Sequence, residues 1–395
     1  MKKLLALLLV LATFLTSSGF LSFLFQQAVT DPVLVPATDI VVPEYTMTYL
    51  GGSRVLLNDR YNQSYPIYDL STGSTTELYV RPQDREAMRS LMEPVLDAGI
   101  PGMPPNAADR YRVMLNENPD NPLLMTTNAH AYPGLSQYVP FHTGFVHTLI
   151  DRETGAVLPA PENTGIVGVT ASDELLCRDN NTLYLYALDG TLKRSAELNF
   201  GDYYVSSIYP LDNGVLVLLH GSLMNPRSIP CAFTVLDQEL KAGPVIELGT
   251  HRSFLSLMTP RQSILSGIVL VPMQNMGGML LLDPATGEYS MLVATEEEMY
   301  VLPNAEATQE QRDAFRNSTG MMAIVGLSQD GSYALIFSVR RGLLKLDLET
   351  LTLTQQMSIE DLEAIDLKPL DAVYLVWDGG EYVVNHNRVF RLQNR

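Results

Sequence analysis

Three short segments bring together side chains that could do chemistry. His142 and His147 are five positions apart, and His220-Gly221-Ser222 places an imidazole two residues from a hydroxyl. Asn116–Asn121 is rich in side-chain oxygen atoms, which are the ligands that Ca²⁺ prefers. These segments are the candidates for a metal pair, for a nucleophile with its base and for a calcium loop.

Each candidate departs from the pattern that its chemistry needs. On one continuous strand, residues five apart point to opposite faces, so we expect no metal shared by His142 and His147. No Gly-x-Ser-x-Gly elbow occurs, and a His and a Ser two residues apart seldom form a triad. The segment that starts at Asn116 lacks a glutamate at its twelfth position, where Thr127 stands. We therefore predict no catalytic residue and no required cofactor, and leave only calcium open.

Cysteine content and charge exclude further classes. Cys177 and Cys231 are too few for a disulfide framework or a multi-cysteine metal site. A single bond between them stays open, and two separate buried thiols are the alternative. The net charge of −18 argues against binding nucleic acid. The hydrophobic fraction of 46% over 395 residues is enough for a large core.

The N-terminus has the pattern of an export signal, which we assign to residues 1–28. Lys2-Lys3 precedes a charge-free run over 4–25, which predicts that the following chain lies outside the cytoplasmic membrane. Two hypotheses remain, an uncleaved anchor and a signal cleaved after Gly19. A lipoprotein is excluded because no cysteine precedes Cys177. We expect one membrane contact at most.

An extended tether and possible closing strand is expected over 29–45, in which Val33–Val35 and Ile40–Val42 could pair as strands. A repeated phrase dominates the body of the chain that follows, residues 46–395. Short apolar runs alternate with turns, which is typical of antiparallel β-structure. One phrase occurs six times: an apolar strand, an aspartate and a turn that often holds Thr-Gly. Aspartate can cap such a turn, and glycine accepts its positive φ. The copies are Asp69 with Gly73, Asp151 with Gly155, Asp189 with Gly190, Asp237, Asp283 with Gly287, and Asp347.

The spacing of these aspartates predicts blades of about four strands each. Periods near 40 to 50 residues are the signature of propellers, and two longer gaps need insertions. The first insertion, 82–104, has apolar residues at helical spacing, and Pro94 should kink or split that helix. The second, 305–320, has a capping box at Thr308 and Gln311. A further capping box joins Ser358 to Asp361, ahead of a helix over 362–365.

Two segments resemble known propeller families. Leu327–Phe337, with Ser328, Asp330 and Gly331, resembles the Ser-x-Asp-Gly motif of WD40-like propellers related to the periplasmic protein TolB. Asp283–Gly287 is similar to the strand-turn phrase of quinoprotein-like and YVTN-type propellers. In those families both motifs form hairpin turns and neither is catalytic. The resemblance therefore implies an extracytoplasmic bacterial propeller without implying a partner.

Together these observations predict an all-β fold with short helical insertions. We predict one propeller of seven four-stranded blades, with six or eight as alternatives. The last three strands, over 373–392, would be completed by an N-terminal strand near Ile40–Val42, because pairing the two ends removes open sheet edges.

The predicted function is a non-enzymatic binding module at the bacterial cell envelope. The expected partner is an envelope protein, a peptide or a glycan, and the protein is expected to be a monomer. The alternative is an extracytoplasmic hydrolase or lyase with its site in the central channel, because propeller enzymes can assemble sites from distant blades. Fold alone decides neither hypothesis.

Overall fold

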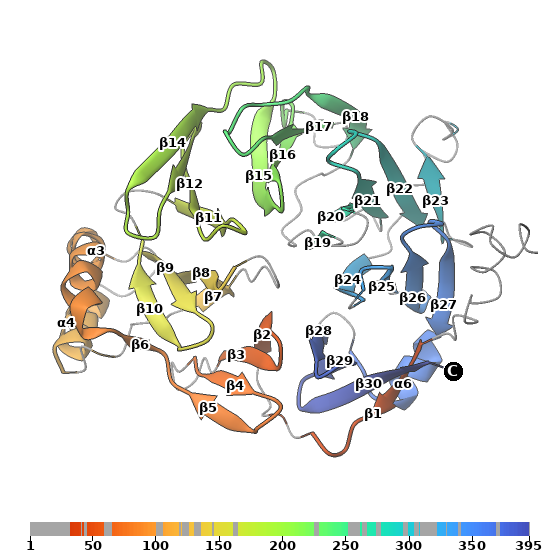
Figure 1. Cartoon of the computed structure of the whole chain (residues 1–395), viewed down its shortest axis with the longest axis horizontal. Helices are drawn as coiled ribbons and strands as arrows, with labels where there is room; N and C mark the ends of the chain where they lie inside the picture. The colour runs from red at the N-terminus through yellow and green to blue at the C-terminus, as the bar shows by residue number, and fades with distance from the viewer. Residues whose placement is uncertain are drawn as a thin grey trace, which may run out of the picture.

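The structure, a computed structural model, is a closed ring of seven β-sheets and confirms the predicted seven-bladed propeller (Figure 1). We label the four strands of each blade A to D from the ring axis outward. The residues that the structure describes are 32–40, 42, 46–58, 65–99, 106–117, 120, 126–129, 136–143, 146–160, 165–224, 229–251, 261–262, 267–273, 278–294, 299–303, 308, 322–328, 330–338, 341–368 and 372–394.

The first four blades follow one another along the chain, and each is an antiparallel sheet in strand order A to D. Their strands are as follows: blade 1, β2 (Thr46–Gly51), β3 (Arg54–Asn58), β4 (Ile67–Asp69) and β5 (Ser74–Thr76); blade 2, β7 (Thr126–Ala129), β8 (Tyr138–Thr143), β9 (Val146–Asp151) and β10 (Ala156–Pro159); blade 3, β11 (Gly165–Val169), β12 (Leu175–Asp179), β13 (Thr182–Tyr186) and β14 (Leu192–Glu197); blade 4, β15 (Tyr204–Leu211), β16 (Gly214–His220), β17 (Ile229–Leu236) and β18 (Ile246–His251).

The last three blades keep this order, and two blades carry a fifth strand on the outside. β6 (Tyr79–Val80) pairs in parallel with β10, and β23 (Met299–Pro303) pairs with β22. The remaining strands are as follows: blade 5, β19 (Arg261–Gln262), β20 (Val269–Met273), β21 (Gly278–Leu282) and β22 (Tyr289–Ala294); blade 6, β24 (Met322–Leu327), β25 (Tyr333–Ser338), β26 (Gly342–Asp347) and β27 (Leu353–Met357); blade 7, β28 (Ala372–Trp377), β29 (Gly380–Asn385), β30 (Arg388–Asn394) and β1 (Pro32–Pro36).

Both faces of a blade are buried, because each blade packs between two neighbours. In β16, Leu216 and Leu218 pack against blade 5, while Val215, Val217 and Leu219 pack against blade 3. This alternation is the period of a strand whose two faces are both covered. The buried apolar residues that the structure describes form seven clusters, one at each contact between neighbouring blades.

The N-terminal strand closes the ring. β1 pairs antiparallel with β30, from Pro32 opposite Asn394 to Pro36 opposite Phe390, and so supplies strand D of blade 7. The prediction that this strand lies near Ile40–Val42 was wrong. Val42 instead packs into the core between blades 7 and 1, where it is 4% exposed. Two prolines suit β1 because an outermost strand needs no N–H on its free side.

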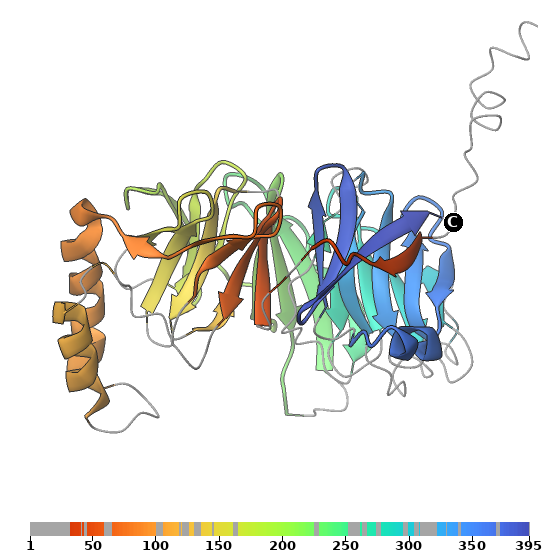
Figure 2. The same ribbon diagram turned by 90° about the horizontal axis from the view of Figure 1, so that it is seen from below.

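The first insertion forms two helices beside blade 2 (Figures 1 and 2). The 3₁₀-helix η1 (Pro82–Asp84) leads into α3 (Arg85–Ala98), which continues through Pro94, so of the predicted kink or split the split does not occur. Met88 and Met92 before the proline and Leu96 after it are all buried in the same cluster, so both halves pack against one core. The helix α4 (Ala107–Glu117) packs beside α3 and was not predicted.

The predicted capping box at Ser358 is confirmed. The Ser358 hydroxyl accepts a hydrogen bond from the Asp361 N–H at 3.1 Å, and the Asp361 carboxylate accepts one from the Ser358 N–H at 2.9 Å. The helix that follows, α6 (Ile359–Ala364), begins three residues earlier than predicted. The box at Thr308 and Gln311 lies outside the described residues, apart from Thr308.

The predicted export segment also lies outside the described residues. Within the described part of the chain, no helix is both long enough and apolar enough to cross a bilayer.

Leu34 tests whether β1 holds the ring closed. Its side chain is 4% exposed and lies in the core between blades 6 and 7, whereas the neighbouring Val35 is 36% exposed. We expect Leu34→Ala to lower the free energy of unfolding by about 2–4 kcal/mol. Val35→Ala should change it by about 0.5 kcal/mol or less. Urea denaturation measures both, and equal effects would contradict the role assigned to β1.

Candidate binding surface

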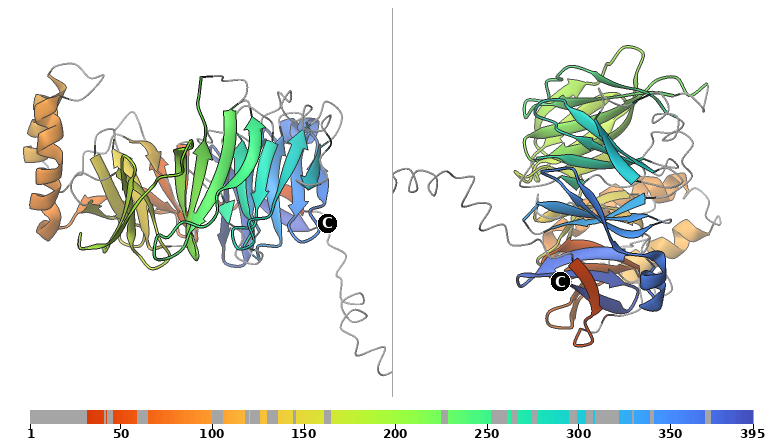
Figure 3. Two further views of the ribbon diagram at one scale, coloured as in Figure 1. Left: turned by 90° about the horizontal axis from the view of Figure 1, so that it is seen from above. Right: turned by 90° about the vertical axis from the view of Figure 1, so that its right-hand side faces the viewer.

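The two faces of the ring differ in what they carry. Because successive strands run in opposite directions, the A–B and C–D turns meet on one face, which we call the Asp-turn face. The B–C and D–A connections meet on the other, which we call the loop face. The helix α6 joins strand D of blade 6 to strand A of blade 7 and marks the loop face at one edge of the ring (Figures 2 and 3).

The repeated aspartates all lie at C–D turns and make the same hydrogen bond. In each of the six copies Oδ1 accepts from the backbone N–H two residues further on, at 2.8 to 3.1 Å. Asp330, in the A–B turn of blade 6, accepts from the Ser332 N–H in the same way at 3.0 Å. This is the Asx-turn arrangement, which ends one strand and starts the next. These aspartates therefore shape turns.

Glycine closes most of these turns through a positive φ. The N–H groups of Gly73, Gly155 and Gly287 each donate to the carbonyl of the aspartate four residues earlier at 2.8 Å. Gly190 and Gly331 also have positive φ and donate to carbonyls three residues earlier, at 2.9 and 3.0 Å.

The two copies without glycine place a leucine in the left-handed region instead. In the Asp237 copy, Leu240 has φ 62°, and in the Asp347 copy, Leu351 has φ 55°. This conformation strains a residue that carries a Cβ. The aspartate is thus the constant part of the phrase, while the glycine can be replaced.

The turn hydrogen bonds lower the pKa of several aspartates. At Asp347, desolvation by partial burial acts to raise the pKa, but hydrogen bonds from Thr350 and Glu349 outweigh it. The same balance, with burial opposed by stronger hydrogen bonds, lowers the pKa of Asp69, Asp151 and Asp330. These carboxylates are ionised in the folded protein at neutral pH, and they already accept hydrogen bonds within their own turns.

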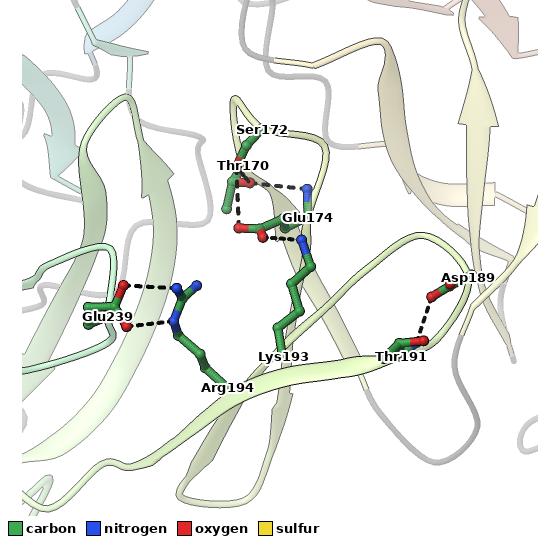
Figure 4. A network of polar contacts seen from close by, with 8 residues as sticks. All are labelled: Thr170, Ser172, Glu174, Asp189, Thr191, Lys193, Arg194 and Glu239. Carbon is green, nitrogen blue, oxygen red and sulfur yellow. Dashed lines mark hydrogen bonds and ion pairs between the residues drawn. The ribbon is translucent and has the colours of Figure 1, made fainter.

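Blades 3 and 4 are joined on the Asp-turn face by a polar network (Figure 4). Arg194 on β14 makes a bidentate contact with Glu239 in the C–D turn of blade 4, with nitrogen–oxygen distances of 2.7 and 2.8 Å. Lys193 pairs with Glu174 in the A–B turn of blade 3 at 2.6 Å. Thr170 and Ser172 in that turn complete the network, because Thr170 accepts from the Glu174 N–H and Ser172 donates to its carboxylate. Both cations thus have carboxylate partners within the protein.

A second polar group is buried between blades 6 and 7. The Tyr333 hydroxyl donates to the Glu381 carboxylate at 2.6 Å, and the Lys345 ammonium lies 4.8 Å from the centre of the Tyr333 ring. Lys345 is only 5% exposed. Desolvation first, and the bond to Glu381 second, raise the pKa of Tyr333 far above its usual range. Tyr333 therefore stays protonated at physiological pH. Its hydrogen bond to Glu381 links blade 6 to blade 7.

The predicted histidine geometry was wrong. His142 and His147 do not share a strand, because β8 ends at Thr143 and β9 begins at Val146. The register places the two histidine positions directly opposite each other. Directly opposite positions of an antiparallel pair lie on one face of the sheet. The five-residue spacing had been interpreted as one strand, and the Thr-Gly in the middle was the signal of the hairpin.

The other two candidate segments are placed as follows. His220 ends β16, and its Nδ1 lies 2.7 Å from the Gly221 carbonyl oxygen, while the Ser222 hydroxyl accepts from the Met224 N–H. Asn116, the first residue of the candidate calcium loop, belongs to α4, and its side-chain oxygen accepts a hydrogen bond from Arg89. Over the described ranges no group of three His, Cys, Asp or Glu residues could hold a metal ion.

The two cysteines are separate buried thiols. Both are free. Cys177 on β12 packs toward blade 2, whereas Cys231 on β17 packs toward blade 5. They point to different contacts between blades, so the open alternative of a bond between them does not apply.

The loop face carries exposed aromatic and apolar side chains on blades 3 and 4. Arg178 lies near the end of β12, Tyr204 and His220 lie opposite each other on β15 and β16, and Leu223 and Met224 follow in the B–C connection of blade 4. We call these five residues the loop-face patch. Tyr204, Leu223 and Met224 are 63%, 50% and 94% exposed. The rings of Tyr204 and His220 lie 5.7 Å apart and 30° from parallel. The two residues are partners across β15 and β16.

Arg178 connects the two blades within this patch. Its Nε donates to the Asn180 carbonyl oxygen at 2.7 Å, and its Nη1 donates to the Val205 carbonyl oxygen at 3.5 Å. Desolvation by burial lowers the pKa of Arg178, and no carboxylate of the described residues opposes this effect. In contrast to Arg194, this guanidinium contacts only backbone carbonyls among the described residues.

Sequence reasoning did not find this patch. Its members come from two blades and from residues that are common at strand ends, so no motif marks them. A weak signal existed in Leu223-Met224, two large apolar residues beside Gly221 and Pro226 in a stretch with turn composition.

Comparisons with known proteins place the chain beside several solved structures at low identity. No family model matches the chain, and no curated protein matches it. A streptogramin B lyase structure is 12% identical, with 92% of this chain and 97% of that chain covered and a TM-score of 0.43. A chain of a mitotic checkpoint complex is 9% identical, with 93% of each chain covered and a TM-score of 0.44. A hydrazine synthase chain of Kuenenia stuttgartiensis is 12% identical, with 91% and 99% covered and a TM-score of 0.40.

The lowered aspartate pKa values predict an acid-sensitive fold. Asp347 has a lower pKa in the folded than in the unfolded state, so its contribution is present above the unfolded value of about 4. That contribution disappears as the pH falls through the folded value. The free energy of unfolding should therefore fall steadily below about pH 4. Urea denaturation between pH 7 and pH 2.5 measures this dependence.

Asp347→Asn is the matched variant for this measurement. Asparagine keeps an oxygen that can accept from the turn but carries no charge. We expect it to lose about 1 kcal/mol or less at pH 7, because the site is partly exposed, and to approach the parent protein in acid. A constant difference at every pH would contradict the assignment.

Proposed function

We propose that this protein is a binding module on the outer side of a bacterial cytoplasmic membrane, and that the loop-face patch is its contact surface. The observation that carries the proposal is the exposure of Tyr204, Leu223 and Met224 on the same face of the ring as Arg178, which contacts Val205. Exposed tyrosine, methionine and arginine are the residue types enriched where proteins meet partners. The Asp-turn face offers less, because its repeated aspartates and Arg194 are engaged within the protein.

The attachment of β1 supports an outward-facing patch. Pro32 pairs with Asn394 at the end of strand C, so the chain enters β1 from the Asp-turn face. With 4–25 in the bilayer, residues 26–31 could span at most about 20 Å. The ring would then stand close to the membrane with its loop face directed away from the lipid. That orientation leaves the patch accessible to a partner in the envelope.

The location is tested by protease treatment of intact protoplasts. The expected result is degradation of the propeller, because Lys2-Lys3 and the apolar run over 4–25 predict an external body. A cytoplasmic marker protein in the same protoplasts is the control and should stay intact. Full protection of the propeller would contradict the predicted topology. Sequencing the N-terminus separates the anchor from cleavage after Gly19.

The contact surface is tested by photocrosslinking in whole cells. A photoreactive residue replaces Met224, which is 94% exposed in the patch, or Leu192, which is 50% exposed on β14 away from it. We expect a discrete adduct from position 224 and none from position 192. Adducts of equal intensity from both positions, or none from position 224, would contradict the assignment of the patch.

A further inference from the structure

The chemistry of the loop-face patch identifies a class of ligand, and this inference rests on the proposed function. Arginine has five N–H donors, and two of those of Arg178 are used by the carbonyls of Asn180 and Val205. A guanidinium with free donors in a half-buried site binds a carboxylate strongly, because ionic hydrogen bonds gain strength where water is partly excluded.

Nearby acids do not satisfy Arg178 in the described part of the chain. Glu247 and Asp202 act on Tyr203, the residue before Tyr204, whose pKa is raised by burial first and by the charge of Glu247 next. Asp179 accepts from the side chain of Asn180. A ligand carboxylate would therefore be the first anion to act on Arg178 among the groups described.

The rest of the patch favours an apolar group beside that carboxylate. Tyr204 packs against His220 with the two rings tilted by 30°, and its rigid side chain offers an exposed contact area at low entropic cost. Leu223 and Met224 add flexible apolar surface three and four residues after His220, and methionine adapts to partners of varied shape. Because a carbonyl only accepts, the Gly221 oxygen takes the hydrogen of His220 Nδ1, which leaves Nε2 of the neutral ring able to accept an N–H.

The overall charge limits how acidic the ligand can be. A net charge of −18 repels long polyanions such as nucleic acids and acidic polysaccharides. A short segment with one carboxylate is repelled only weakly by the net charge and can still pair with Arg178. Methionine and leucine also suit an apolar amino-acid side chain better than the hydroxyl-covered surface of a sugar.

We propose that the loop-face patch binds a peptide segment in which one carboxylate lies next to an apolar side chain. Arg178 pairs with the carboxylate, Tyr204 and Met224 cover the apolar side chain, and His220 accepts a peptide N–H.

The probe is an array of synthetic octapeptides presented to the full chain in detergent. Each acidic peptide has a matched Asn or Gln version, and each free C-terminus has a matched amide. The tightest binder and its uncharged match are then compared by calorimetry. We expect the acidic form to bind at least about tenfold tighter and to weaken as salt increases. Oligogalacturonate represents the acidic sugars as a competing ligand class. Equal binding of the acidic and uncharged peptides, or stronger binding of oligogalacturonate than of any peptide, would overturn the proposal.

Variants assign the interaction to the patch. Arg178→Gln should weaken binding of the acidic peptide about tenfold or more, so that the acidic peptide and its uncharged match bind with equal affinity. Tyr204→Ala should weaken both forms by a similar factor, about three- to tenfold. Arg194→Gln, an arginine of the same blade on the Asp-turn face, is the matched control and should change nothing. Equal losses from Arg178→Gln and Arg194→Gln would overturn the proposal.

Two further measurements keep the test decisive. Where Arg178→Gln lowers the melting temperature sharply, Tyr204→Ser and Met224→Ser assign the binding to the patch, because these residues are exposed, and the comparison of acidic with neutral peptides on the parent protein remains the test of the carboxylate. Glu162 lies outside the described residues but is an acid three residues before Gly165, the strand partner of Arg178. Glu162→Gln should leave peptide binding unchanged, and a loss equal to that of Arg178→Gln would show that Arg178 serves an internal ion pair. If position 224 still crosslinks while acidic and neutral peptides bind equally well, the proposed ligand class is wrong but the proposed binding function is supported. If position 224 yields no adduct, the binding function itself fails.

Discussion

Every blade in this protein has two apolar faces, and neither can be left in water. The strand β16 shows the constraint most simply, because alternate residues pack against the blades on either side. A linear stack of such sheets would leave one bare face at each end. A ring is the arrangement in which every face has a neighbour, and β1 completes the last blade of that ring. The rest of the architecture serves this requirement.

Local turn chemistry explains why so much of the fold could be predicted. The aspartate at each C–D turn satisfies its own backbone, so its hydrogen bonds lie within a few residues and its spacing is visible in the sequence. Contacts between distant residues gave no such signal. The pairing of His142 with His147 depends on a hairpin that a strand pattern can hide. The closing strand was misplaced because Val33–Val35 and Ile40–Val42 are equally apolar, and only the partner strand distinguishes them.

The site was less predictable than the fold for the same reason. Arg178 and Tyr204 come from different blades and meet only because strand B of one blade ends beside strand A of the next. α3 illustrates the opposite error, since local rules predicted a break at Pro94 and tertiary packing of Met92 and Leu96 overrode it. Where packing between distant elements determines the structure, residue type and spacing predict it poorly. In the turns, where contacts within a few residues determine the structure, residue type and spacing predict it well.

The use of β1 as the outermost strand of blade 7 also sets an order of events in synthesis. Pro32–Pro36 is made before every other strand of the described ring, and its partner Arg388–Asn394 is made after them. The ring therefore cannot close on a nascent chain until Arg388–Asn394 has been synthesised. The entropic cost of joining segments so far apart grows only slowly with their separation, but the search for such contacts is slow. Until β1 and β30 meet, the edge of blade 7 is open to strands of other chains.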